Sequence, residues 1–287
     1  MKIRAPAKIN LSLRVVGRRK DGYHLLDTLM VPITLYDEVT ISGSRLGKSG
    51  REALRVTCNH PLVPSGEENL AYRAAALLLA KKGIRARVRV RIRKRIPVGG
   101  GLGGGSSDAA ATLLGLNRLF RLGCERRELL ALAASLGADV PFFIYGRPAR
   151  ARGVGEQVRP LAVFPKIWLV VLDPGFPVST AWVYRQLRMH TLTKPIGNTS
   201  IKLSLRDPER VGQLLVNDLE KVAMRRYPEI AVLKQRLTGA GAVGALMSGS
   251  GSCVFGIFPS EQVARVAFRR LRKEGGKDQA YLVRSLN

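Results

Sequence analysis

A run of glycines in this 287-residue chain has the composition of a phosphate site. Six of the seven residues from 99 to 105 are glycine, and two serines follow. Backbone without side chains can curl round an anion and point its N–H groups inward, at the positive end of the next helix. Serine hydroxyls could bind phosphate oxygens or a phosphate-bound Mg²⁺. This predicted cradle consists of Pro97, Gly99, Gly100, Gly101, Gly103, Gly104, Gly105, Ser106 and Ser107.

Other uses of the glycine run are a hinge, a close-packed turn, or part of a dinucleotide or P-loop site. A Gly-x-Gly-x-x-Gly pattern is present, but the strand before it carries arginine at alternate positions and no acidic residue stands ~20 residues further on. No Lys-Ser or Lys-Thr follows the glycines, which excludes a P-loop. Against a simple turn, Ser106, Ser107 and Asp108 are expected to cap a helix.

A lysine and an acid could supply the reacting groups. Lys8 and Asn10 share the polar side of an alternating strand, and Asp139 stands among apolar residues after a helix. A carboxylate held by a lysine can accept a hydroxyl proton during phosphoryl transfer. The ordinary alternatives are a solvated strand face for Lys8 and Asn10, and a helix N-cap with proline in the next turn for Asp139.

An aromatic ring and an imidazole, Tyr23 and His24, follow a tight-turn signal at residues 21–22. Such a pair suits stacking on a flat base and hydrogen bonding to it, although a hairpin-edge tyrosine and a surface histidine would look the same. The histidines at 24, 60 and 190 are scattered, so a histidine metal site is not expected.

Periodicity places these residues on an α+β framework. Strands are expected over 8–16, 25–35, 39–41, 54–57 and 85–96, and helices from a capping box at 65–68 to 82, over 106–120 and over 125–136. In the second half, strands are expected at 168–172, 253–258 and 280–283, and helices at 180–189, 208–226, 228–238 and 260–274. The pattern predicts two domains, 1–153 and 154–287, each with helices over a mostly antiparallel sheet.

The charge is unusual, with 48 Lys and Arg against 21 Asp and Glu, formally +27. Arginines alternate from 85 to 93, which raises an RNA-binding alternative, but interleaved aromatics and nucleic-acid motifs are lacking, so a solvated strand face is favoured. Anionic small substrates are the other class of ligand that such a positive field attracts.

Three distant cysteines, no apolar leader and no apolar run of the ~20 residues a membrane span needs indicate a cytoplasmic protein.

Together these motifs resemble the GHMP kinase superfamily. Its central motif, Pro-x-x-x-Gly-Leu-Gly-Ser-Ser-Ala, is present at 97–109 with extra glycines, and its third motif at 247–255. Strings at 6–11, 21–24, 99–107 and 137–141 resemble, within that superfamily, the kinases that act on a diphosphocytidyl methylerythritol in the non-mevalonate isoprenoid pathway.

The resemblance implies a two-domain fold with the active site in the cleft between domains, and ATP-dependent phosphorylation of the substrate's C2 hydroxyl, giving the 2-phosphate and ADP. It implies Asp139 as the base, Lys8 as its charge partner and Asn10 beside them. His24 would read the cytosine edge, and Tyr23 and Tyr184 would sandwich the ring. The further residues implied are Asn69 and Lys94 at the adenine, and Thr180, Ser248, Gly249, Ser250 and Gly251 at the substrate.

Several points stay open at this level. Mg²⁺ is expected with ATP, but its protein ligands are not assigned. The chain could be a monomer or a homodimer. The rival functions are a kinase of another small alcohol, mevalonate-like or homoserine-like, and more remotely an RNA-binding protein. No membrane partner is expected, nor is nucleic acid despite the positive charge.

Overall fold

The computed structural model describes the whole chain except residues 48–49, 188–192, 196, 198–206 and 275. The chain forms two compact units. Unit 1 consists of Met1–Ala7, Tyr36–Val98 and Gly103–Gly146, and unit 2 of Lys8–Leu35, Gly99–Leu102 and Arg147–Asn287. Two long strands, β1 (Lys2–Arg18) and β2 (His24–Arg45), supply residues to both, so the units interleave along the sequence. The domain boundary expected between residues 153 and 154 stays a prediction.

Unit 1 has helices packed on one face of a sheet. Its strand β4 (Ala86–Arg93) pairs antiparallel with the second part of β2 and parallel with β3 (Ala53–Cys58). Side chains of β4 alternate strictly between buried and exposed, with Val88, Val90 and Ile92 inside and the arginines outside. This confirms the half-buried strand with a solvated arginine face, and the antiparallel pairing agrees with the exclusion of a dinucleotide-binding fold.

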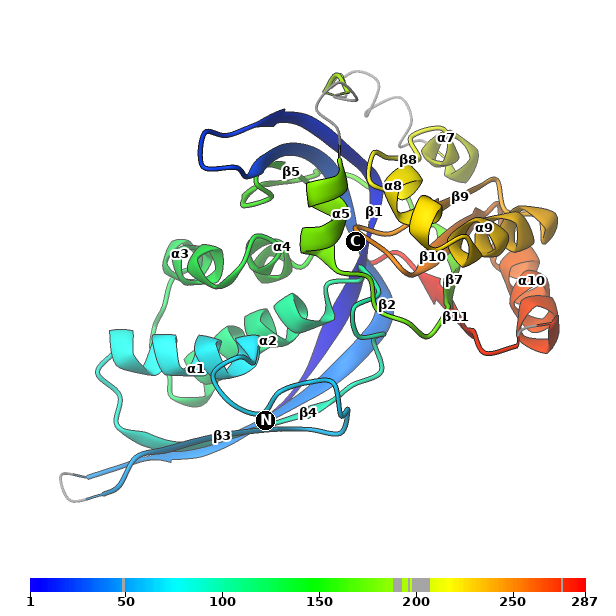
Figure 1. Cartoon of the computed structure of the whole chain (residues 1–287). Helices are drawn as coiled ribbons and strands as arrows, with labels where there is room; N and C mark the ends of the chain where they lie inside the picture. Colours follow the sequence, from blue (N-terminus) through cyan, green and yellow to red (C-terminus); the bar gives the residue numbers. More distant parts are fainter. Residues whose placement is uncertain (48–49, 188–192, 196, 198–206, 275) are drawn as a thin grey trace. The chain divides into compact units, whose positions relative to one another are not determined.

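The four helices of unit 1 lie together beside these strands (Figure 1): α1 (Leu70–Lys81), α2 (Gly104–Leu119), α3 (Arg126–Leu136) and α4 (Val140–Tyr145). The helix α2 packs closely on the sheet at Gly115, where an added Cβ would lie 2.3 Å from Ile41 Cδ1 and 2.7 Å from Ile3 Cδ1. This close contact anchors the helix that begins at the glycine run.

Two helix starts differ from the sequence expectation. The helix α1 begins at Leu70 rather than at the capping box, because the Asn69 Oδ1 accepts the N–H of Ala71 at 2.8 Å and caps it. The helix α2 begins at Gly104, before the serines, with Gly103 as its cap in the left-handed region at φ 72°. The serines therefore lie within the first turn of α2 and do not cap it.

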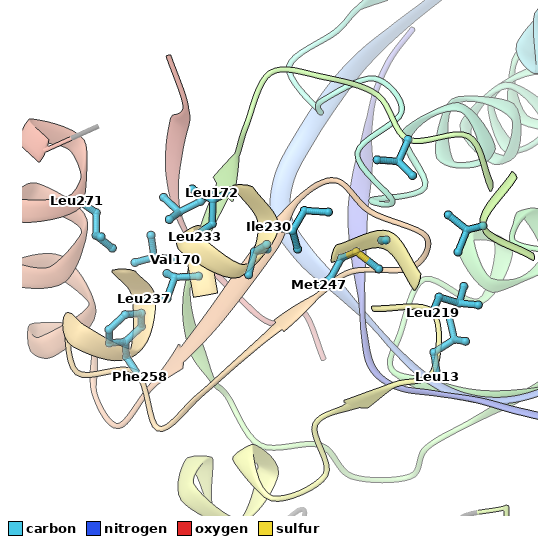
Figure 2. Close-up of a cluster of buried hydrophobic side chains, with 14 of the residues drawn as sticks. Leu13, Val170, Leu172, Leu219, Ile230, Leu233, Leu237, Met247, Phe258 and Leu271 are labelled. Carbon is cyan, nitrogen blue, oxygen red and sulfur yellow. The ribbon is translucent and has the colours of Figure 1, made fainter. Parts of the chain in front are cut away.

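Unit 2 contains an antiparallel sheet ordered β11 (Gln279–Arg284), β7 (Trp168–Asp173), β10 (Val254–Phe258), β9 (Gly244–Met247). The helices α9 (Glu229–Gly239) and α10 (Glu261–Glu274) cover it (Figure 1). Leu233 and Leu237 of α9 and Leu271 of α10 meet Val170 and Phe258 of the sheet in one buried cluster (Figure 2). Unit 2 thus has a hydrophobic core of its own.

Unit 2 also contains strands that pair with β2 rather than with this sheet. The first part of β2 pairs with β5 (Ala149–Gly153), which pairs with β6 (Gln157–Pro160). The two strands expected at 25–35 and 39–41 are one continuous 22-residue strand, β2. The helix expected at 180–189 is α5 (Thr180–Gln186), and its last two expected residues lie outside the described ones.

The helix expected over 208–226 is broken in three: α7 (Pro208–Gly212), the short strand β8 (Val216–Asn217) and α8 (Glu220–Arg226). The break has a tertiary cause. The side-chain amide of Asn217 donates to the carbonyls of Met247 and Gly249, both at 2.8 Å, while β8 pairs in parallel with β1. These non-local bonds outweigh the local helix preference.

Across the described residues no helix combines the length and the apolar character that a membrane crossing requires. The three cysteines are free thiols.

Candidate active site

The start of α2 in unit 1 presents unused backbone donors. The first intrahelical bond runs from the Ser107 N–H to the Gly103 carbonyl at 2.9 Å, so the N–H groups of Gly104, Gly105 and Ser106 have no acceptor within the helix. Gly105 is exposed and Ser106 half-buried. Three free donors at the positive end of a 16-residue helix form a geometry suited to a phosphate group.

The first part of the glycine run belongs to unit 2 and is held by packing. Gly99 and Gly101 both have positive φ, at 73° and 76°. A Cβ on Gly101 would lie 2.0 Å from the carbonyl oxygen of Ser248, and one on Gly99 would lie 2.5 Å from the Cβ of Pro177. At these two positions close packing requires glycine, because no side chain fits there, and their role at a phosphate stays a prediction.

The loop that meets the glycine run is the second small-residue segment, residues 248–252. The Ser248 hydroxyl donates to the Gly101 carbonyl at 3.1 Å, and the Cys253 N–H donates to the Gly100 carbonyl at 3.1 Å. The Ser250 hydroxyl lies 2.7 Å from the Thr180 hydroxyl at the start of α5. The fold of unit 2 therefore brings together three segments that are far apart in the sequence: Gly99–Gly101, Ser248–Gly251 and Thr180.

The polar side of β1 is buried in unit 2. Lys8 and Asn10 are 4% and 3% exposed, and the Lys8 Nζ donates to the Asn10 Oδ1 at 2.6 Å. The Asn10 Nδ2 donates to the Thr28 hydroxyl at 2.8 Å, and that hydroxyl donates to the Ser12 carbonyl at 2.7 Å. The solvated-face alternative for this strand is wrong. A lysine oriented by a relay of neutral groups is well placed to polarise a substrate oxygen.

Lys8 also lies against both loops of unit 2. The backbone N–H of Lys8 donates to the Leu102 carbonyl at 2.9 Å, and a Cβ added to Gly249 would lie 3.2 Å from the Lys8 Nζ. The small residues of the 248–252 loop thus leave room for the ammonium group.

His24 and Tyr184 stack on each other in unit 2, with ring centroids 5.2 Å apart and planes at 29°. Partial burial, together with the Arg18 guanidinium, lowers the pKa of His24 below its ordinary value, so the ring is neutral at pH 7. A neutral imidazole offers one donor and one acceptor nitrogen. Tyr23 is 64% exposed, with its ring available to a ligand.

The two residues implied at the adenine are occupied within unit 1. Asn69 caps α1, and its Nδ2 donates to the Pro64 carbonyl at 2.7 Å. The Lys94 ammonium is buried between Asp37 and Asp108, with its Nζ 2.5 Å and 2.9 Å from their Oδ2 atoms. Although desolvation opposes the charge, the two carboxylates raise the pKa of Lys94, and burial raises the pKa of Asp108 to about 7.

Asp139 stands at the N-cap position of α4, with Pro141 in the first turn. Its backbone is helical at φ −84°, and its side chain makes no capping bond to α4. Asp139 belongs to unit 1 and Lys8 to unit 2, and their partnership stays a prediction.

Sequence reasoning missed three side chains that organise these groups: Thr28, Asp37 and Asn217. Each stands beside another polar residue in the sequence, with no motif to mark it, and only its spatial partners reveal its role. Among the described residues no three His, Cys, Asp or Glu gather as metal ligands. A metal ion here would depend on the phosphates it accompanies and on the two first-turn serines, of which Ser107 is buried with its hydroxyl unpartnered.

Comparison with known proteins shows the family of this chain. Residues 69–147 match the family model described as GHMP kinases N terminal domain, and residues 200–277 match GHMP kinases C terminal. The chain is 48% identical over 265 residues to 4-diphosphocytidyl-2-C-methyl-D-erythritol kinase of Geobacter metallireducens, covering 92% of each chain. The same enzyme of Syntrophotalea carbinolica is 46% identical over 99% of this chain and 98% of the relative.

A solved structure is similar over the full length. The crystal structure of a 4-(cytidine 5'-diphospho)-2C-methyl-D-erythritol kinase superposes with a TM-score of 0.83 at 41% identity, covering 100% of both chains. The similarity to these kinases, in sequence and in fold, therefore extends over essentially the whole chain.

Proposed function

Because this chain belongs to the 4-diphosphocytidyl-2-C-methyl-D-erythritol kinase family of the GHMP kinases, we propose that it transfers the γ-phosphoryl group of ATP to the C2 hydroxyl of 4-diphosphocytidyl-2-C-methyl-D-erythritol. The products are the 2-phosphate and ADP, in the non-mevalonate isoprenoid pathway. The observation that carries the proposal is the continuous set of contacts in unit 2 joining Lys8, the glycine run and Thr180. We further infer a cytoplasmic setting, and a monomeric or homodimeric state.

The proposed chemistry requires a proton acceptor and a cation at the attacking oxygen. Asp139, in the string at 137–141 that resembles this kinase family, takes the proton of the C2 hydroxyl as general base. Lys8, oriented by Asn10, stabilises the charge that develops on the oxygen. Positioning and charge stabilisation supply most of the catalysis in phosphoryl transfer.

The phosphate chain of ATP is expected at the first turn of α2. The N–H groups of Gly104, Gly105 and Ser106 bind phosphate oxygens, and the serine hydroxyls add two further donors. Mg²⁺ bound to ATP would neutralise charge on the phosphates, with Ser106 or Ser107 as the protein oxygen within reach.

The cytosine is expected at the His24–Tyr184 pair. Cytosine presents both donors and acceptors at its edge, and neutral His24 can match one of each. Tyr184 and the exposed Tyr23 supply aromatic faces, and Thr180 with Ser248–Gly251 contacts the rest of the substrate.

An ATP-consumption assay tests the proposal. Wild-type protein with Mg²⁺ should consume ATP only when the diphosphocytidyl substrate is present. Methylerythritol phosphate lacking the CMP portion, mevalonate and homoserine should be turned over far less efficiently, because they offer nothing to His24 and Tyr184. Equal turnover of the nucleotide-free substrate would reject the cytosine assignment.

The same assay includes a variant of the proposed base. Asp139→Asn should lower kcat by about 10²–10⁴-fold while ADP affinity is retained. The matched control is Asp278→Asn, which alters a carboxylate that precedes β11 and pairs with Arg236 of α9, and should leave kcat unchanged. Near-wild-type turnover of Asp139→Asn would rule out its role as base.

A further inference from the structure

A buried ion triad lies at the start of α2 in unit 1. Lys94, Asp37 and Asp108 have side chains that are 4%, 0% and 4% exposed, and the single ammonium bridges the two carboxylates. An ammonium group and two carboxyl groups in so little water are costly unless each is held in place. Such an arrangement calls for a function beyond stability.

The triad links the chain on both sides of the phosphate loop, the segment from Pro97 to the start of α2. Asp37 Oδ1 accepts the N–H groups of Arg95 and Ile96, at 2.6 Å and 3.0 Å, immediately before the loop begins at Pro97. Asp108 lies in the helix that follows the loop, and its Oδ2 is held by Lys94. Lys94 therefore connects the chain entering the loop with the chain leaving it.

Lys94 also lies close to the first turn of α2. A Cβ added to Gly104 would lie 2.9 Å from the Lys94 Nζ and 3.1 Å from Ile96 Cγ2. Gly104 is one of the residues whose N–H points to the phosphate position. The ammonium thus lies against the backbone at Gly104, and this explains why glycine is needed at 104 although its φ is not positive.

We propose that Lys94, Asp37 and Asp108 are positioning residues that hold the first turn of α2 in its phosphate-binding geometry, and that Lys94 acts on the phosphates through this turn rather than by contacting adenine. The proposal rests on ATP being the co-substrate, as proposed above. It assigns roles to Asp37 and Asp108, and it replaces the adenine contact expected for Lys94. Because the Asp108 Oδ1 is buried without a partner, Asp108 depends on Lys94 for its place.

Ligands of increasing phosphate content distinguish the two roles considered for Lys94, positioning of the phosphate-binding turn and contact with adenine. Binding of adenosine, ADP and Mg-ATP to wild type, Lys94→Met and Asp108→Asn is measured by isothermal titration calorimetry, together with kcat and the KM for ATP. If Lys94 positions the cradle, Lys94→Met leaves the Kd for adenosine within about twofold. It should weaken ADP and ATP binding or lower kcat/KM for ATP by about 10–100-fold, the scale of a small misplacement of binding groups. Asp108→Asn, which keeps the side-chain volume and an acceptor, should shift the same constants in the same direction by less.

The control is Lys82→Met, which removes another lysine–carboxylate pair of unit 1, Lys82 with Glu128, at the far end of α1. Its binding constants should equal those of wild type. Circular dichroism and thermal melts identify any variant that does not fold, and if Lys94→Met is such a variant, Asp108→Asn decides the question.

Three results would overturn the inference. The first is an equal loss of adenosine and ADP affinity in Lys94→Met, which would make Lys94 an adenine contact. The second is unchanged nucleotide binding and kcat in the folded variants, which would reject the positioning role alone. The third is wild-type protein that binds no adenine nucleotide, which would reject the proposed function and the inference with it.

Discussion

Two strands of this protein alternate polar and apolar residues in the same way, yet one polar row is buried and the other is solvated. In β1, Lys8, Asn10 and Ser12 are at most 4% exposed. In β4, the arginines of the alternating row are all exposed. The comparison shows that alternation determines which residues share a face, but not whether water reaches that face.

The side chains themselves explain how each row is tolerated. In the β1 row the Lys8 ammonium donates to Asn10 and the Asn10 amide donates to Thr28, so these two side chains are matched although the Ser12 hydroxyl is not. The β4 row consists of long guanidinium groups, and Arg89 even lies beside Arg55 of β3 in the sheet register. Burying that row would leave like charges without counterions. We therefore expect the buried β1 row to be part of the active site and the solvated β4 row to be ordinary protein surface.

The largest expected effect comes from removing the charge of the buried row. Lys8→Met should lower kcat by about 10²–10³-fold, because it deletes a cation poised to stabilise charge at the reacting oxygen. Steady-state kinetics at saturating ATP measure it, with ADP binding as the check that the cradle is intact. A kcat within threefold of wild type would mean that the β1 row is not catalytic.

A smaller effect is expected from the relay behind Lys8. Thr28→Val removes the hydroxyl that accepts from Asn10 and donates to the Ser12 carbonyl, leaving buried groups without partners. It should lower the free energy of unfolding by about 1–3 kcal/mol, measured by urea denaturation. The control is Thr40→Val in the same strand β2, half-buried and opposite Arg91, where the change should stay within about 0.5 kcal/mol. Equal losses at both positions would remove the contrast between the rows.

The smallest effect is expected in the solvated row. Arg89→Gln should alter the free energy of unfolding by no more than about 0.5 kcal/mol, toward stability if anything, because it relieves repulsion from Arg55. Its kinetic constants should equal those of wild type. In gel shifts, any RNA binding by wild type should vanish steeply as salt rises. Specific binding that survives physiological salt and is lost in Arg89→Gln would make this row a nucleic-acid surface instead.

Most of the secondary structure was predictable because its signals are local. The alternating pattern of β4, the helix ended by Gly137 and the strand running into Phe258 all depend on neighbouring residues. The Asn69 cap was missed although its partners, Ala71 and Pro64, are close along the chain. The break of the 208–226 segment at Asn217 has another cause, because it depends on bonds to Met247 and Gly249, far along the chain. Local propensity cannot register such partners.

The sequence by itself determined the chemistry that this chain offers: a glycine and serine cradle, a lysine, an acid and an aromatic pair, in an order that resembles one kinase family. Only the tertiary structure decided how those residues are used. The fold buried the Lys8 row, required Gly101 for packing against Ser248, and placed the Lys94 ammonium beside Gly104. The physical reason is that residue type and spacing specify which bonds a side chain can make, whereas burial and partners depend on chain segments that meet only in the folded protein.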